Sequence, residues 1–554
     1  MKKKKIIPRI SEKLIENKIY LFVCIMTIIV VSLPAISGGI FWGHDSGFHF
    51  QRIISIKNSL LRGEFPVRIF KEIWGGYGYG APLCYPSIFL YVPAILYLIG
   101  CPLIVSYNLF LICINILTLF IAIYSYTIIT NSKEVGLLSA ILYELSIYRM
   151  VDLYTRSAVG EYLALTFCPL ILCGLVLIYR GYFQKWWVLA LGFSGIIQSH
   201  ILSFVLMSIV SSIYIIFHLK NFLQRERILA MVKAAIATLL INIWFLIPLL
   251  QIYGHDFRIS TLGSGFWDTD TQIFYLFDFL LIGISGMPRT PSLLLIIGCI
   301  LLTYQILISN DHRELLQNVK GYLMAGIIST FMLTNLFPWF LFKIKYLQGF
   351  LEKFQFIWRL NTVCILTLSI CAAYGFYYYL ISTRTKYHVI FSITLITCIY
   401  SLMYINRYVD TAEKVGSDVV LDRLWMDDLY LPKNNTIFSR EELKSNIENI
   451  QYYDYKRGDS KVSLQYSIPE QQSSAYIDVP ITYYPGYIAY INESQADVVC
   501  SEEGVVRVLL PQNLVDGTLS VQYEECLLYK IADMISLISI ITFLIFIIRQ
   551  FQKN

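Results

Sequence analysis

APLCYPSIFLYVPAILYLIG, residues 81–100, is the stretch that decides how the chain is folded. It is apolar and has roughly the 20 residues that a membrane-crossing helix needs, but it contains three prolines, which interrupt helices. Whether this stretch crosses a membrane or not reverses the direction of every later segment. The arrangement of the whole chain therefore depends on it.

The composition predicts a polytopic membrane protein, because the 554 residues are 56% hydrophobic and only 15% charged. The lysine-rich start is followed by the apolar segment Ile19–Trp42, which is too long for the core of a signal peptide, roughly 7 to 15 residues. It is predicted to be a retained first helix with a cytoplasmic N-terminus. The net charge of +6 comes largely from short loops and tails, so it indicates topology and no nucleic-acid partner.

Eleven further apolar segments bring the predicted number of crossings to about 12. If 81–100 does not cross, the basic loops YRGYFQKWW, HLKNFLQRERI, NDHRELLQNVKG and STRTKYH and the tail RQFQKN lie with the N-terminal lysines, as the positive-inside rule requires. Residues 81–100 are then an interfacial or re-entrant helix, and both termini are cytoplasmic in a bacterial plasma membrane. The further crossings lie near 104–129, 135–150, 161–179, 186–218 (two helices), 228–251, 291–308, 320–338, 359–382, 387–405 and 531–548.

The polar region 406–530 predicts an external β-sandwich-like domain, because short alternating or β-branched runs recur there between turn residues. A disulfide between Cys500 and Cys526 in this region is open. The predicted fold is thus mainly α. Its parts are a cytoplasmic N-terminus 1–18, a transmembrane domain 19–405 with a long first external loop 43–103, the β-rich domain, and a last helix with its tail 531–554.

The first external loop begins in FWGHDSGFHFQRI, residues 41–53, and contains the strongest catalytic candidate, Asp45. A carboxylate partly shielded at the outer end of a helix has a raised pKa and can accept a proton from an alcohol. Residues 47–62 predict an amphipathic helix in the headgroup layer, and Arg52 and Arg68 are candidates to hold a lipid phosphate. The alternative is that Asp45 only caps that helix.

His44 and His49 raise the question of a metal, because imidazoles are common ligands. The two histidines are five residues apart and do not share a helix face, so no metal ligand is assigned, although a divalent metal stays open as a cofactor. His44 is expected to tune Asp45 or to bind the acceptor, and both histidines are candidates for substrate binding.

Two further outer segments supply charged residues. The loop 148–161 contains Asp152, Arg156 and Glu161. The two acids are candidates for a second catalytic carboxylate and Arg156 is a candidate for substrate binding, but Arg156 and Glu161 could instead simply pair within the fold. Arg359 begins a predicted crossing, where a lone cation needs an anionic partner: a substrate phosphate or, alternatively, a lipid headgroup at the interface. The loop 252–290 has acidic residues among aromatics, which could line a sugar site or merely solvate a loop.

Several of these stretches together resemble a known family. GHDSGFHFQRI, LLRGEFPVRI, GYGYGAPLCYP, YRMVDLYTRSAVGEYLALTFCPL, SHILS and FQFIWR resemble bacterial membrane proteins labelled 6-pyruvoyl-tetrahydropterin-synthase-related, within the C-type (GT-C) glycosyltransferases. The resemblance covers most of residues 15–405, and YYPGYIAYI resembles the outer β-domain of related cell-wall glycosylating proteins. Nothing resembles the zinc histidines of the soluble pterin enzymes.

The resemblance implies that Asp45 is the base of a sugar transferase and that the second acidic position falls on Asp152 or Glu161. The family more often has paired acids where this chain has His44 and Asp45. His200 and Gln355, in the matching SHILS and FQFIWR stretches, join the candidate substrate-binding residues.

The expected reaction is an inverting transfer of a sugar from a polyprenyl-phosphate carrier to a cell-wall or surface glycan on the outer face, in contact with membrane lipid. The alternatives are a transporter or flippase of lipid-linked saccharides and a non-catalytic envelope assembly factor.

Overall fold

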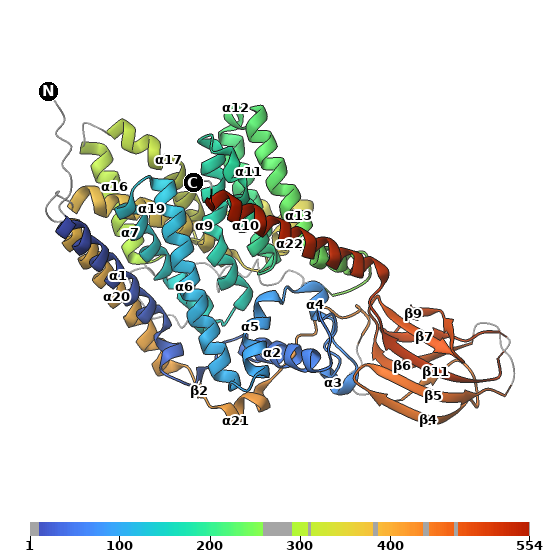
Figure 1. Ribbon diagram of the computed structural model, residues 1–554. Coiled ribbons are helices and arrows are strands. Elements are labelled where there is room, and N and C mark those ends of the chain that lie inside the picture. Colours follow the sequence, from blue (N-terminus) through green and yellow to red (C-terminus); the bar gives the residue numbers. More distant parts are fainter. Residues whose placement is uncertain are drawn as a thin grey trace. The chain divides into compact units, whose positions relative to one another are not determined.

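The computed structural model describes residues 10–258, 291–308, 312–380, 386–435, 442–469, 475–512 and 514–552 (Figure 1). The chain divides into two compact units. The first unit comprises Met1–His49, Ile99–Thr238 and Leu262–Arg423, and the second comprises Phe50–Leu98, Leu239–Thr261 and Leu424–Asn554.

Within the described residues, seven helices are long and apolar enough to cross a membrane, so the chain is a mainly helical, multi-pass membrane protein. They are α1 (Ile10–Ile36), α6 (Leu103–Thr130), α9 (Val159–Tyr179), α13 (Arg225–Tyr253), α19 (Asn361–Leu380), α20 (Lys386–Thr411) and α22 (Leu527–Gln552).

Each of the other five predicted crossings also contains a helix, but its apolar part has 17 residues or fewer. These are α7 (Lys133–Glu144), α10 (Trp186–Ile197), α11 (Ile201–Phe217), α16 (Leu293–Ile308) and α17 (His312–Met332). The helices α7 and α10 have 12 residues each, fewer than a crossing needs. Polar residues follow both: Ser146 and Arg149 after α7, and Gln198 to His200 after α10.

The most enclosed helices of the first unit are α9 and α19, which are apolar on all sides and almost wholly buried. Small residues let α16 pack closely on α19: a Cβ added to Gly375 would lie 1.9 Å from the carbonyl oxygen of Gly298. Such small-residue contacts are typical of helix pairs in membranes, where backbones approach closely.

The decisive stretch 81–100 is described throughout, and its longest helix, α5 (Tyr91–Leu98), has eight residues. It follows the short helices α4 (Ala81–Cys84) and η1 (Ile88–Leu90). No helix within these residues is long enough to cross, as predicted. The predicted helix at 47–62 is also confirmed, as α2 (Ser46–Leu61).

The C-terminal β region lies in the second unit and forms two antiparallel sheets (Figure 1). One has the order β3-β6-β10-β9 and the other β4-β5-β11-β7-β8. In β5, Val462, Leu464 and Tyr466 are buried in alternation with more exposed residues, which gives the sheet one core face. The strands are β3 (Lys444–Ser445), β4 (Gln451–Gly458), β5 (Lys461–Ser467), β6 (Tyr476–Thr482), β7 (Tyr487–Ile491), β8 (Ser494–Ala496), β9 (Val498–Cys500), β10 (Val505–Leu509) and β11 (Asp516–Tyr523).

Two details differ from the prediction. The β region starts later than residue 406, because α20 continues to Thr411, and α22 begins at Leu527 instead of 531. Cys500 and Cys526 are both free thiols, so the open disulfide is not formed.

Candidate active site

The loop between α1 and α2 is fixed to the segment that follows α7. Its backbone amides donate to the carbonyls of that segment, from His44 to Thr155 (3.1 Å) and from Asp45 to Arg156 (2.8 Å). The Ser46 hydroxyl donates to Ser157 Oγ over 3.0 Å. These three contacts join residues more than a hundred positions apart and fix the backbone that carries Asp45.

Gly43 permits this close approach. A Cβ at this position would lie 2.2 Å from Ser157 Oγ and 2.5 Å from the carbonyl oxygen of Tyr154. The second atom belongs to the backbone and cannot rotate away. Glycine is therefore needed where the two segments meet.

The partner segment has an unusual backbone. Val151–Thr155 is a single turn of π-helix, η2, and Ser157 has a positive φ of 52°. Both conformations are rare in proteins overall, and where they occur they are often part of a functional site. They place Asp152, Arg156 and the start of α9, with Glu161, around one point of the first unit.

The two predicted acids of this segment are engaged by arginines. Arg156 Nη1 pairs with Asp152 Oδ1 at 2.5 Å and also with Glu161 Oε2. Arg359 Nε pairs with the other oxygen of Glu161 at 2.8 Å. All four side chains are buried. The pairing of Arg156 with Glu161, which was the alternative to a catalytic role for Glu161, is therefore formed.

Arg359 is held by its own segment as well. Its Nη1 donates to the carbonyl oxygen of Phe354 (2.5 Å) and to Gln355 Oε1 (3.0 Å). Gln355 has a positive φ of 63°. Of the candidates in FQFIWR, Gln355 and Arg359 are thus in direct contact.

Two stacked aromatic rings flank the arginines. Phe356 and Trp358 have ring centroids 4.1 Å apart. The Arg156 guanidinium lies 5.5 Å from the centroid of Trp358, and that of Arg359 lies 5.3 Å from the centroid of Phe356. Both separations are in the range of cation–π contacts, which keep the two cations in place.

Asp45 differs from the other two acids. It is partly exposed, and among the described residues its carboxylate forms no hydrogen bond or ion pair. Although it directly precedes α2, the capping contact that was the alternative is absent from the described residues. Burial raises the pKa of Asp45 to about 6, with a further upward effect of Glu161 and opposing effects of Arg156 and Arg359. A carboxylate with this pKa and no partner can accept a proton near neutral pH.

The three histidines have different surroundings. His44 is exposed as a whole residue, but neighbouring protein atoms shield part of its ring from water, and this desolvation, together with the charge of Arg156, lowers its pKa. His200 is buried, its Nδ1 lies 2.9 Å from Ser203 Oγ, and it interacts electrostatically with Glu161. His49 is buried on α2, edge-to-face with Phe48. His44 and His200 therefore belong to the charged cluster.

Arg52 and Arg68 belong to the second unit, whereas Asp45, Asp152, Arg156, Glu161 and Arg359 belong to the first. Arg52 is buried and donates to the carbonyl oxygen of Pro86 (2.6 Å) and to Ser87 Oγ (2.9 Å). Arg68 pairs with Glu525 at 2.7 Å and Asp533 at 2.6 Å. The guanidinium groups of both are engaged by protein atoms.

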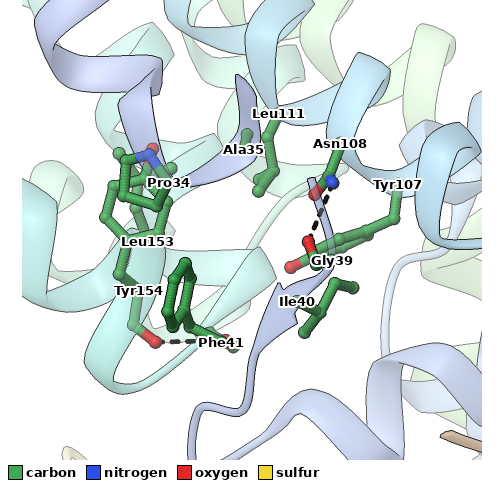
Figure 2. A pocket seen from close by; sticks show the side chains of 11 residues that line it. Pro34, Ala35, Gly39, Ile40, Phe41, Tyr107, Asn108, Leu111, Leu153 and Tyr154 are labelled. Carbon is green, nitrogen blue, oxygen red and sulfur yellow. Dashed lines mark hydrogen bonds between the residues drawn. The ribbon is translucent and has the colours of Figure 1, made fainter. Parts of the chain in front are cut away.

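The described part of the chain contains no group of three or more His, Cys, Asp or Glu side chains placed to hold a metal. It does contain a cavity of about 20 Å³ beside the Asp45 loop, lined by Gly39, Tyr107, Asn108 and Tyr154 among others (Figure 2). That volume suits about one water. The cavity is too small for a sugar and is not the substrate site. Most of the 252–290 loop lies outside the described residues.

Sequence reasoning missed three contributors to this site. The Tyr148 hydroxyl donates a hydrogen bond to Glu161 Oε1 over 3.4 Å. Ser157 Oγ accepts a hydrogen bond from the Ser46 hydroxyl, and the ring of Trp358 packs against the guanidinium of Arg156. Tyr148 and Ser157 lie within the same charged loop as Asp152, and Trp358 precedes Arg359. Their nearness to charged residues at a helix end was the available signal.

Comparisons with known proteins give distant likenesses. No family model matches the chain. An uncharacterized protein of Lactococcus lactis is 25% identical over 244 residues, which are 42% of this chain and 39% of the relative. The chain thus spans well under half of that relative's length.

Similar solved structures are the mycobacterial arabinofuranosyltransferase AftD, the oligosaccharyltransferase of Archaeoglobus fulgidus, and ArnT from Cupriavidus metallidurans bound to undecaprenyl phosphate. Their identities are 13%, 11% and 12%, and their TM-scores 0.42, 0.41 and 0.39. The likeness covers 70%, 72% and 70% of this chain and 27%, 56% and 63% of theirs. A likeness of this degree carries no argument about activity.

Proposed function

We propose that the chain is a membrane glycosyltransferase of the GT-C type, which moves a sugar from a polyprenyl-phosphate carrier to a glycan acceptor. The observation that carries the proposal is Asp45: a partly exposed carboxylate without a hydrogen-bond partner among the described residues, with a pKa near 6, beside two arginines. The sequence stretches that resemble this family include all of these residues.

In the proposed reaction Asp45 takes the proton of an acceptor hydroxyl as its oxygen attacks the anomeric carbon. The new bond forms between that oxygen and the anomeric carbon, and the bond from the anomeric carbon to the carrier phosphate breaks. The electron pair leaves with the phosphate. One displacement inverts the anomeric centre, and no second carboxylate is needed as a covalent nucleophile.

Arg156 and Arg359 are proposed to stabilise the departing phosphate, because guanidinium groups bind phosphate oxygens in a planar, charge-assisted fashion. Both are buried and fixed by Glu161, which orients them before a ligand arrives. Asp152 and Glu161 are less suited to act as the base, because each already accepts from an arginine. The proposal does not depend on Arg52 or Arg68. Both belong to the second unit, and every guanidinium nitrogen of Arg68 already donates to a protein oxygen.

The test uses the purified full chain in detergent with radiolabelled polyprenyl-phosphate sugars and a panel of glycan acceptors. Wild type is compared with Asp45→Asn, which keeps the size of the side chain and removes the base, and with Asp410→Asn, a matched change at an exposed position. Loss of a general base typically lowers the rate about 10² to 10⁴-fold. Transfer is therefore expected to fall by about a thousandfold in Asp45→Asn and to persist in Asp410→Asn.

Equal transfer by wild type and Asp45→Asn would refute the mechanism. Absence of transfer with every donor, together with movement of a lipid-linked saccharide across vesicles, would favour a flippase instead.

A further inference from the structure

The clearest unexplained group near the site is one oxygen of Asp152. This side chain is fully buried, and its Oδ1 pairs with Arg156 at 2.5 Å. Its Oδ2 is buried too and has no hydrogen-bond partner among the described residues. A buried carboxylate oxygen left without a partner costs free energy, whereas a carboxylic acid hydroxyl in the same place can donate to a ligand.

The charges of the cluster also favour a proton on one of its carboxyl groups. Two guanidinium groups, of Arg156 and Arg359, face three carboxyl groups, of Asp45, Asp152 and Glu161. If all three carboxyls were ionised, the cluster would carry one net negative charge and would repel an anionic ligand. One proton on a carboxyl removes that charge.

Asp152 is the carboxyl whose surroundings most favour a proton. Burial, then the charge of Glu161, raises its pKa well above the usual range, although Arg156 and Arg359 oppose this. Glu161 has an arginine on each oxygen, and Asp45 is partly exposed. The titratable or charged side chains that interact with Asp152 are Tyr148, Arg156, Glu161, Arg359 and Tyr404.

We propose that Asp152 is a neutral carboxylic acid whose Oδ2 hydroxyl donates a hydrogen bond to the anionic group of a ligand held by Arg156 and Arg359. The ligand class is a phosphodiester, the group that links sugar and lipid in the donor, so this inference rests on the proposed function. Asp152 thereby recognises a phosphate oxygen without adding negative charge. Asp45 stays ionised and free to act as the base.

The proton is tested directly by infrared spectroscopy of the full chain, labelled with ¹³C at aspartate carboxyls, at pH 8, where Asp45 is ionised because its pKa is about 6. Wild type should show the C=O band of a protonated aspartate, and Asp152→Asn should lack it. Asp410→Asn should keep it. Absence of the band in the wild-type protein overturns the proposal, whether or not Asp152→Asn folds.

The hydrogen bond is tested with farnesyl methyl phosphate, a phosphodiester with one negative charge and no titration of its own near neutral pH. Its binding should shift the wild-type band to lower frequency, whereas the uncharged farnesyl methyl ether should not. Asp152→Asn retains a neutral donor and should bind the phosphodiester within about threefold of wild type. An ionised Asp152 predicts instead that Asp152→Asn binds it about tenfold or more tightly, since a repelling charge is lost.

The two ideas fail in different ways. If neither lipid binds the wild-type protein, the proposed function is wrong, and the infrared band without ligand still decides whether Asp152 is protonated. If the phosphodiester binds and the band does not shift, the proposed function survives and Asp152 is not its donor.

Discussion

Two buried clusters, one around Arg68 and one around Arg156 and Arg359, both combine arginines with acidic and aromatic side chains, but they differ in how fully their hydrogen bonds are satisfied. In the second unit, Arg68 donates to Glu525, to Asp533 and to the backbone carbonyl of Trp244, so each of its nitrogens has an acceptor. In the first unit, Arg156 and Arg359 pair with Asp152 and Glu161. Within the described residues the carboxylate of Asp45 forms no hydrogen bond, and Oδ2 of Asp152 has no hydrogen-bond partner.

The comparison teaches that a buried arginine with acidic neighbours is not by itself a site. The Arg68 cluster is closed: its aromatic neighbours Trp244 and Tyr529 have centroids 5.6 and 5.4 Å from the guanidinium. We expect it to stabilise the second unit. The Asp45 cluster, which consists of Asp45, Asp152, Arg156, Glu161 and Arg359, is open. Oδ2 of Asp152 and the carboxylate of the partly exposed Asp45 have no hydrogen-bond partner within the described residues, so both can bond to a ligand.

The largest effect on stability is expected for Glu161→Gln. Gln keeps the shape of Glu161 but removes the charge that both Arg156 and Arg359 pair with, and breaking a buried ion pair costs about 3–5 kcal/mol. The measurement is the free energy of unfolding in detergent. Glu413→Gln, which breaks an exposed pair with Arg423, is the control and should change it far less. If Glu161→Gln lowers the free energy of unfolding no more than the control does, then the ion pairs of Glu161 with Arg156 and Arg359 do not stabilise this part of the fold.

Gly43→Ala should have the next largest effect on stability. The added methyl group meets the Tyr154 carbonyl oxygen at 2.5 Å, and overpacking of this kind costs about 1–3 kcal/mol. Because the displaced loop carries Asp45, transfer should fall as well, by about tenfold or more. Gly416→Ala is the matched control, since nothing lies within 4 Å of its added Cβ. Unchanged transfer in Gly43→Ala would show that the attachment of the loop does not position the base.

Asp533→Asn tests the closed cluster. It removes one of the two acids paired with Arg68, and a hydrogen bond to a charged group contributes about 1.5–3 kcal/mol. The expected loss is at the lower end, about 1.5 kcal/mol, because Glu525 still pairs with Arg68. Transfer should stay at the wild-type rate. A gain in affinity for a prenyl phosphate would show instead that Arg68 binds the carrier, as the sequence suggested, and would remove the distinction between the clusters.

The smallest effect is the pH dependence of kcat/KM. Asp45 must be ionised to accept a proton, and its pKa is raised to about 6 by burial. The base form is therefore complete above that pH and is lost below it, so kcat/KM should fall about tenfold for each pH unit below 6 and level off above. A limb centred near pH 4, where an unperturbed aspartate titrates, would assign the base elsewhere.

The helices and strands could be predicted because their signals are local. Each of the twelve apolar segments contains a helix, and the strands β5, β6, β7, β10 and β11 lie in the region 406–530, where alternating or β-branched runs predicted a β domain. The lengths of α7 and α10 could not be predicted. Hydropathy averages over a window and does not show that α7 already ends at Glu144, whose buried side chain pairs with the buried Arg149 of the next short segment.

The candidate site was predictable in part. Asp45, Asp152, Arg156, Glu161 and Arg359 were all found, because ionisable residues at the ends of apolar segments stand out. The pairing of Arg156 with Glu161 was considered from their spacing, but that of Glu161 with Arg359 could not be read from the sequence, since the two are almost two hundred residues apart and no local pattern joins them. For the same reason Arg68 was grouped with Asp45, its neighbour along the chain, instead of with Glu525 and Asp533.

The short ladder between β1 (Ile40–Phe41) and β2 (Lys414–Val415) has a consequence for the order of folding. It pairs the start of the Asp45 loop with residues that follow α20, and Trp42 donates to the carbonyl oxygen of Glu413 over 2.9 Å. During synthesis these contacts cannot form until the ribosome has passed residue 415. The Asp45 loop of a nascent chain is thus completed late, after the helices of the first unit have been made. A chain that stops short of β2 would insert its helices without fixing this loop.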